Sequence, residues 1–264
     1  MRHTLFVLLA VLVGATVSAQ SPASVLAPTG SLRATFLGMN PVQGRVDPQT
    51  GVATGLVPDL IKELAARLGV PYRILPAPDA AGVIGSLKSG AADIGFLAYD
   101  ETRAREVEFG PPFAVMYNSY VVRADSALQK SADVDRAGLT VAAVRGQTQE
   151  LFVSSHMKNA HVRVLPAMPP PAVVEMLLTG GEVDAFAVNR QRALDAASGA
   201  PGRLRALPDS FMEVEQSLIV NTGERAKLDA LARFVDEMRA SGFIKAAIDR
   251  AKIAGVDVAP ARSR

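Results

Sequence analysis

The stretch LKSGAADIGFLA, residues 87–98, decides the fold class of this chain. Its first residues belong to a helix-forming segment that Gly90 ends, and the apolar run after it is typical of a buried strand. Asp93 stands at the strand entry, where a carboxylate can accept a hydrogen bond from a turn amide. The segments before it alternate in the same way: a strand at 31–37, a helix at 56–68, a strand at 72–75 and a helix at 80–89. This order predicts a parallel sheet with helices on its faces.

The same pattern returns at residues 178–187, LTGGEVDAFA, with Leu, Gly and Asp at the same spacing and an apolar strand behind them. Before it we expect a strand at 140–144, a turn at Gly146, a helix from Thr148 and a strand at 161–165. The sequence therefore predicts an α/β protein of two lobes, each a mainly parallel sheet flanked by helices.

Two extended segments rich in β-branched residues, 119–123 and 215–221, join the lobes and predict a hinge with two crossings. We expect lobe 1 to contain residues 31–118 and 214–264, and lobe 2 to contain residues 119–213. The other segments are expected to be a mobile lead-in at 20–30, a loop at 38–55 with a hairpin tip at Thr50-Gly51, a stiff connector at 169–171, a helix at 224–238 and a frayed tail at 259–264.

Residues 1–19 have the pattern of a signal peptide. Arg2 and His3 precede an apolar segment, and Val17-Ser18-Ala19 fits the small-residue rule for cleavage after Ala19, so we expect a periplasmic protein. The formal charge of +2 falls to +1 without Arg2, and nothing favours nucleic acid or an anionic membrane as a partner. The sequence has no Cys and no cluster of His, Asp and Glu at metal-binding spacing, so neither a metal nor another cofactor is expected.

A charged loop lies within FLAYDETRAREVEFGPPFAVMYNSY, residues 96–120. Arg103 follows the end of a predicted buried strand, where α/β proteins usually hold their ligands. Its planar guanidinium can grip a carboxylate with two charge-assisted hydrogen bonds. From the residues alone, a ligand-binding arginine and a solvated loop in which Arg103 pairs with Glu106 are equally favoured.

The strongest motifs are Gly55-Leu56-Val57-Pro58-Asp59-Leu60, Leu68-Gly69-Val70, Leu87-Lys88-Ser89-Gly90 with Asp93, Arg103 ahead of Phe109, Gly146-Gln147-Thr148, and Gly181 with Asp184-Ala185. In this order and spacing they resemble the family 3 periplasmic solute-binding proteins, the amino-acid-type receptors of ABC importers. The resemblance covers nearly all of the chain after residue 19. It implies a Venus-flytrap protein whose two lobes close on a small solute, a monomer that serves the membrane permease of an ABC importer.

The resemblance also implies a site. In such proteins the arginine that matches Arg103 clamps the ligand's carboxylate. The hydroxyl residue that matches Thr148, together with the loop at Gly146 and Gln147, holds the same group from the other lobe. A helix N-terminus suits an anion on electrostatic grounds as well. Taken alone, Thr148 could equally be a plain helix N-cap, and the two roles are compatible.

The chain departs from the family where the ligand's ammonium would bind. The usual Asp is replaced by Asn189, which carries no charge. The other ligand positions that the resemblance implies are Phe96, Ala98 and Asp100 ahead of the arginine, and Met39 with Asn40 in the first ligand loop. Asp100 could replace the missing charge, but we favour it as a cap of the following turn. An unpaired ammonium in a closed cleft would cost several kcal/mol.

We therefore expect a receptor for a small organic carboxylate, with a standard α-amino acid as the less favoured ligand. A dehydratase-type enzyme is the first alternative, because the resembling family includes periplasmic cyclohexadienyl dehydratases. Such chemistry needs a placed acid or base. His156 and His161 are expected at the surface, and nothing pairs Asp100 or Glu150, so the sequence does not favour an enzyme. The second alternative is a detached sensory subunit that reports its liganded state to a membrane protein.

Overall fold

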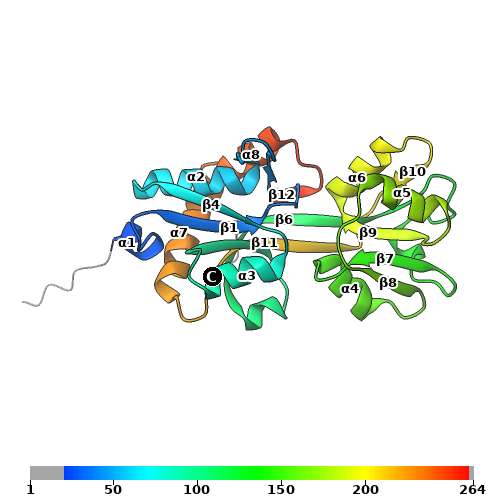
Figure 1. The fold of residues 1–264 in the computed structure, drawn as a ribbon, viewed down its shortest axis with the longest axis horizontal. Helices are drawn as coiled ribbons and strands as arrows, with labels where there is room; N and C mark the ends of the chain where they lie inside the picture. Colours follow the sequence, from blue (N-terminus) through cyan, green and yellow to red (C-terminus); the bar gives the residue numbers. More distant parts are fainter. Residues whose placement is uncertain (1–20, 262–264) are drawn as a thin grey trace, which may run out of the picture.

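The computed structural model describes residues 21–261 and shows one mixed sheet that runs through two lobes (Figure 1). The strands are β1 (Leu32–Leu37), β2 (Arg45–Val46), β3 (Ala53–Thr54), β4 (Tyr72–Ala77), β5 (Ile94–Ala98), β6 (Val107–Arg123), β7 (Thr140–Val144), β8 (His161–Leu165), β9 (Ala185–Asn189), β10 (Leu204–Ala206), β11 (Met212–Asn221) and β12 (Val256–Val258). The helices are α1 (Pro22–Leu26), α2 (Leu56–Leu68), α3 (Ala80–Lys88), α4 (Thr148–His156), α5 (Pro171–Thr179), α6 (Arg190–Gly199), α7 (Arg225–Ala240) and α8 (Phe243–Ala251), with 3-10 turns η1 (Arg103–Arg105) and η2 (Ser131–Asp133).

The strand order is β4-β1-β5-β11-β6-β9-β7-β8, and β10 and β12 also pair with β6. The outer strands of each half are parallel, as predicted: β4, β1 and β5 in one, and β8, β7 and β9 in the other. The expectation of a mainly parallel sheet is nevertheless only partly confirmed. Strand β11 is antiparallel to both β5 and β6, and β6 is antiparallel to β9. The sheet is mixed because the two strands that join the halves run in opposite directions.

The apolar cores fall into two groups, which define the lobes. In lobe 1, helices α2, α7 and α8 cover one face of the sheet and α3 covers the other, and their core residues come from segments 26–116 and 214–256. In lobe 2, α5 and α6 pack on one face and α4 on the other, with core residues between 120 and 207. Figure 1 shows β6 and β11 passing from one lobe to the other. The exact lobe boundaries stay a prediction, since both strands belong to both halves.

The sequence pattern that occurs twice has the same structural role in both lobes. Asp93 accepts a hydrogen bond from the amide of Arg33 at 2.9 Å, and Asp184 accepts one from the amide of Thr140 at 2.8 Å. Each Asp thereby ties the entry of its strand to the neighbouring parallel strand. The glycine before each Asp, Gly90 or Gly181, has a positive φ (71° and 74°), a conformation that side chains disfavour.

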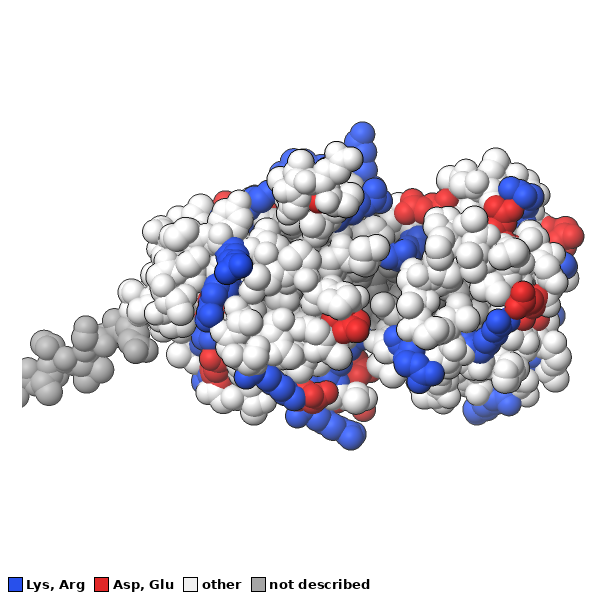
Figure 2. Space-filling model, viewed as in Figure 1, with Lys and Arg blue, Asp and Glu red and all other residues white. Residues whose placement is uncertain are grey.

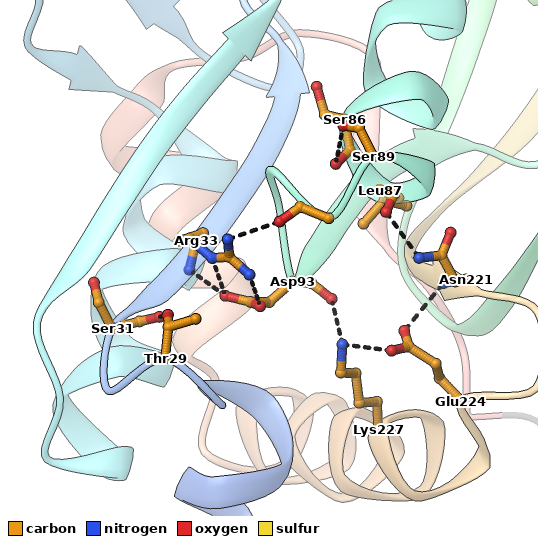
Figure 3. A network of polar contacts seen from close by, with 11 residues as sticks. Thr29, Ser31, Arg33, Ser86, Leu87, Ser89, Asp93, Asn221, Glu224 and Lys227 are labelled. Carbon is orange, nitrogen blue, oxygen red and sulfur yellow. Dashed lines mark hydrogen bonds and ion pairs between the residues drawn. The ribbon is translucent and has the colours of Figure 1, made fainter.

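The first occurrence of the pattern, at Asp93, belongs to a larger polar network, which Figure 3 shows. The guanidinium of Arg33 donates to both carboxylate oxygens of Asp93, at 3.0 and 2.6 Å, and to the carbonyl of Gly90. Lys227 of α7 donates to the carbonyl of Asp93 and pairs with Glu224 at 2.7 Å. This network fastens α7 and the Gly90 turn to the N-terminal ends of β1 and β5, and the Asp93 carboxylate within it is almost fully buried.

Two predictions about the chain ends are wrong where the structure describes them. The expected mobile lead-in contains α1, whose Leu26 is buried in the core of lobe 1. The expected frayed tail begins at Ala259, which is buried and whose carbonyl accepts a hydrogen bond from Arg239. Both segments are too short to show an apolar period, so the sequence did not reveal that tertiary packing orders them. The signal-peptide prediction concerns residues 1–19, which lie outside the described part.

Other predictions are confirmed. Gly51 has a positive φ at the tip of the β2–β3 hairpin, and α5 begins at Pro171 after the proline connector. Helix α2 has the predicted bounds, with Gly69 as its left-handed C-cap. Within residues 21–261, no helix has the length and apolar character needed to span a bilayer.

Candidate functional site

A cavity of about 440 Å³ lies between the lobes; we call it the cleft cavity. From lobe 1 it is lined by Leu37, Met39, Asn40, Pro78 and Asp79. From lobe 2 it is lined by the polar residues Arg145, Gln147, Gln149, Asn189 and Arg192 and by an apolar wall of Val144, residues 166–171, Ala187 and Val188. Figure 2 shows the surface hollowed between the two halves of the molecule.

The cleft cavity sits at the carboxyl ends of five strands. Its walls include the last residues or the following loops of β1, β4, β7, β8 and β9. Parallel strands of both lobes therefore aim their ends at one space, the position where open α/β sheets bind ligands. The volume is in the usual range for small-molecule sites.

Arg103 lies where the two lobes meet. Its side chain is buried, and its Nη1 donates to the carbonyl of Ala98 in lobe 1 at 3.0 Å. Its Nη2 donates to the carbonyl of Gly146 in lobe 2 at 2.8 Å. Burial lowers the pKa of the Arg103 guanidinium, and the nearby carboxylate of Asp100 partly offsets that effect. An arginine starts from so high a pKa that it keeps its charge.

The alternative of an exposed salt-bridge loop is therefore not what the structure shows. Glu106 pairs with Lys88 at 2.6 Å instead of with Arg103. Arg103 does not itself line the cleft cavity: it lies behind the loop whose residues Arg145 and Gln147 do. The carbonyl that accepts from Arg103 belongs to Gly146, the residue between these two lining residues.

Four of the predicted site residues line the cleft cavity: Met39, Asn40, Gln147 and Asn189. Asn189 ends β9 and caps α6, accepting from the amide of Arg192 at 2.9 Å. Its Nδ2 lies 3.4 Å from Oδ1 of Asn40, which brings the two lobes into contact across the cavity.

The other predicted site residues are placed outside the cavity lining. Phe96 is fully buried in the core of lobe 1 against Phe113, and Ala98 offers only its carbonyl, to Arg103. Asp100 accepts from the amides of Thr102 and Arg103, as expected for a cap. Thr148 is buried at the first position of α4, and the N-cap is Gln147, so the N-cap interpretation of Thr148 is wrong.

Sequence reasoning missed Arg192, whose guanidinium donates to the carbonyl of Met39 in the opposite lobe. Burial lowers the pKa of Arg192, Asp195 raises it, and Arg45 lowers it further. A signal was present: Asn189 after an apolar strand is a good N-cap, and it predicts a helix whose first turn carries Arg192.

The charge of the cleft cavity is net positive. Arg145 and Arg192 face one acidic residue, Asp79, and the Asp79 carboxylate already caps α3 by accepting from the amide of Gly82 at 2.7 Å. The lining residues include no aromatic ring. Such a cavity suits an anion with an aliphatic body better than a cation or a stacked ring system.

Comparisons with known proteins agree with this arrangement. The family model of the bacterial extracellular solute-binding proteins, family 3, matches residues 38–251. The chain is 25% identical over 199 residues to the L-cystine-binding protein TcyJ of Escherichia coli (strain K12), covering 74% of this chain and 73% of that protein.

Solved structures share the fold at low identity. The P235GK mutant of ArgBP from T. maritima is 23% identical with a TM-score of 0.71, covering 88% of this chain and 99% of that one. A putative ABC transporter binding component from Wolinella succinogenes, complexed with lysine, is 21% identical with a TM-score of 0.72, covering 84% and 95%. The ancestral amino acid-binding protein AncCDT-1, described as a precursor of cyclohexadienyl dehydratase, is 21% identical with a TM-score of 0.72, covering 88% and 99%.

Two α/β lobes on a shared mixed sheet, with a cavity at the strand ends between them, define a type II periplasmic binding protein fold. The matched family model covers most of the chain. The chain belongs to the bacterial extracellular solute-binding proteins, family 3.

Proposed function

We propose that this protein is the periplasmic receptor of an ABC importer and closes its two lobes on a small organic carboxylate. The observation that carries the proposal is the positive cleft cavity with a buried arginine, Arg103, directly behind its loop at residues 145–147. The names of the similar proteins, which refer to cystine, lysine and arginine, also support a ligand with a carboxylate.

The proposed binding step exchanges one acceptor for another. Arg103 now donates to the neutral carbonyl of Gly146. A carboxylate is a stronger acceptor for a guanidinium than a carbonyl is, because it adds the attraction of opposite charges and can accept two parallel hydrogen bonds. A ligand that reaches this end of the cavity would take over that donor, with the polar residues Gln147 and Thr148 beside it.

Among carboxylates, an ordinary α-amino acid is the less favoured ligand. Its ammonium would need a carboxylate partner in the closed cleft. Asn189 is neutral, and Asp79, the one acidic residue of the lining, already uses Oδ1 to cap α3. Arg192 adds a positive charge on the same side of the cavity, which opposes a second cation.

Titration calorimetry against a panel of aliphatic carboxylic acids and the corresponding α-amino acids tests the proposal. We expect the acids without an amino group to bind more tightly. Tight binding of an ordinary amino acid in preference to its deaminated analogue would overturn the ligand class.

The Asn189→Asp variant sharpens this experiment. Asn and Asp are equally good N-caps, so α6 should be preserved while a negative charge enters the cavity. We expect the preference to shift towards amino acids by about ten-fold or more, since hydrogen bonds to charged groups contribute about 1.5–3 kcal/mol. An unchanged preference would show that residue 189 does not meet the amino group.

We propose binding without turnover. Neither His156 nor His161 lines the cleft cavity, and Glu150 accepts from the amide of Gly146 and from Ser154. Incubation of each bound acid with the protein, followed by absorbance and mass spectrometry, checks this. Release of water or carbon dioxide from the acid would show that the protein is an enzyme and would contradict binding without turnover.

A further inference from the structure

A second, smaller pocket of about 160 Å³ opens beside the cleft cavity in lobe 2. Five residues line both spaces: Met168, Pro169, Pro171, Val188 and Arg192. The small pocket, which we call the side pocket, therefore adjoins the cleft cavity, and Arg145 and Gln147 line the cleft cavity alone.

The side pocket is apolar. Its remaining walls come from the sheet face and from helices α5 and α6, with Val174, Phe186 and Ala196 among them. Its charged residues are Arg192, which reaches across to Met39, and Asp195, which accepts from Gln191 on its own helix at 2.7 Å. Both charged groups thus have partners outside the pocket, and an apolar occupant would leave neither of them unpaired.

We infer that the side pocket receives the tail of the ligand, and that the ligand class is a monocarboxylate with an unbranched aliphatic chain. The inference rests on the proposed function, because it needs the carboxylate to bind near Arg103 at the opposite end of the cleft cavity. An apolar cavity of about 150 Å³ holds a benzene molecule, so the side pocket has room for about six carbon atoms. The lining of the cleft cavity has no aromatic ring and that of the side pocket has only Phe186, so most of the apolar wall along the path is aliphatic and suits an aliphatic chain.

A chain-length series of straight carboxylates from propanoate to decanoate, measured by calorimetry, tests the inference. Each added CH₂ that enters an apolar pocket should tighten binding about four-fold. We expect the affinity to rise over the middle of the series and to level off once the side pocket is full. A flat series, or no binding of any member, would overturn the inference, whereas the proposed function fails only if the wider panel of carboxylic acids does not bind either.

The variant Ala196→Phe fills the side pocket from α6, and Ala197→Phe is its matched control. Ala197 is the next residue on the helix and does not line the side pocket. For Ala196→Phe we expect octanoate to bind about ten-fold or more weakly and propanoate to bind as it does to the wild type. Ala197→Phe should leave both affinities unchanged.

Thermal melting of each variant establishes that it is folded, and Ala196→Leu serves as a smaller replacement with a smaller expected loss. Equal effects of Ala196→Phe on octanoate and propanoate would contradict a tail pocket. Unchanged octanoate affinity in both Ala196 variants would contradict it as well.

Discussion

Arg103 shows why the position of a side chain decides its role. On a surface loop its charge would be paired loosely with Glu106, whereas the structure buries it between carbonyls of two lobes. Its hydrogen-bond acceptors are neutral carbonyls, and the nearby Asp100 offsets only part of the cost of burying the charge. This is the physical reason to expect a negatively charged ligand next to it.

The Arg103→Ala variant should therefore bind its ligand more weakly. Truncating one member of a desolvated ion pair costs about 2–5 kcal/mol of binding free energy. Calorimetry with the tightest-binding acid measures the loss. A loss below about 1 kcal/mol would show that Arg103 does not hold the carboxylate and would leave that role to Arg192.

At the scale of single elements, the repeated Asp motif offers an internal comparison. Asp93 holds both a neighbouring amide and the guanidinium of Arg33, while Asp184 holds an amide alone among the contacts described. The two residues stand at equivalent points of equivalent strands. Their substitution separates the contribution of an ion pair from that of an amide bond.

We expect Asp93→Ala to destabilise the protein by about 3 kcal/mol, near the lower limit for a buried pair because Arg33 is partly exposed. Asp184→Ala should cost about 1 kcal/mol, the contribution of one hydrogen bond. Urea unfolding followed by circular dichroism gives both values. Equal losses would mean that the Arg33 pair adds nothing.

A second element-scale prediction concerns acid. The carboxylate of Asp135 accepts from the amides of Ala160, Asn159 and Lys158, which tie the entry of β8 to the loop before β7. These bonds lower the pKa of Asp135 below its ordinary value of 3.8. Its contribution to stability is therefore complete above pH 3.8 and is lost as the pH falls through the lowered pKa.

The Asp135→Asn variant should consequently lose less stability than the wild type between pH 7 and pH 2. The variant is expected to be less stable at pH 7 and to differ little from the wild type at pH 2. Melting temperatures at the two pH values measure this. If the melting temperatures of wild type and variant fell in parallel with pH, the ionised Asp135 carboxylate would not stabilise the fold in this way.

The sequence predicted the helices and strands better than it predicted which residues meet at the cleft cavity. Helix α2 and strands β7 and β8 have their predicted bounds because each shows a clear apolar pattern: a helical period in α2, an apolar run in β7 and an alternation in β8. Strand β12 was not predicted, because its three residues are too few to show a period and form a strand only by pairing with β6. Local patterns can place Arg192 in the first turn of a helix, but they do not show that Arg192 and Asp79 line one cavity, because that depends on how the two lobes approach.

At the scale of the whole molecule, a few polar contacts cross between the lobes. Arg103 of lobe 1 reaches Gly146, and Arg192 of lobe 2 reaches Met39. Gln191 accepts from the amide of Ala254 at 2.6 Å. These contacts hold the lobes together, so they bear on the balance between closed and separated lobes.

Arg192→Ala should shift this balance towards separated lobes. A hydrogen bond to a charged group is worth about 1.5–3 kcal/mol, which corresponds to a shift of about ten-fold or more. Small-angle X-ray scattering without ligand should give a larger radius of gyration for this variant. Arg163→Ala, which removes the pair with Glu182 inside lobe 2, is the control and should leave the scattering unchanged. Identical curves for all three proteins would contradict a bridging role for Arg192.

The pairing of β6 with β11 has a consequence for how such receptors diversify. Asn118 and Met212 face each other in register, so the chain enters and leaves lobe 2 at adjacent points. Most residues around the cleft cavity lie between those two points. A single continuous segment of the chain therefore supplies most of the cavity lining, and recombination at two points that are neighbours in the fold would exchange that lining while the remaining strands keep their pairing.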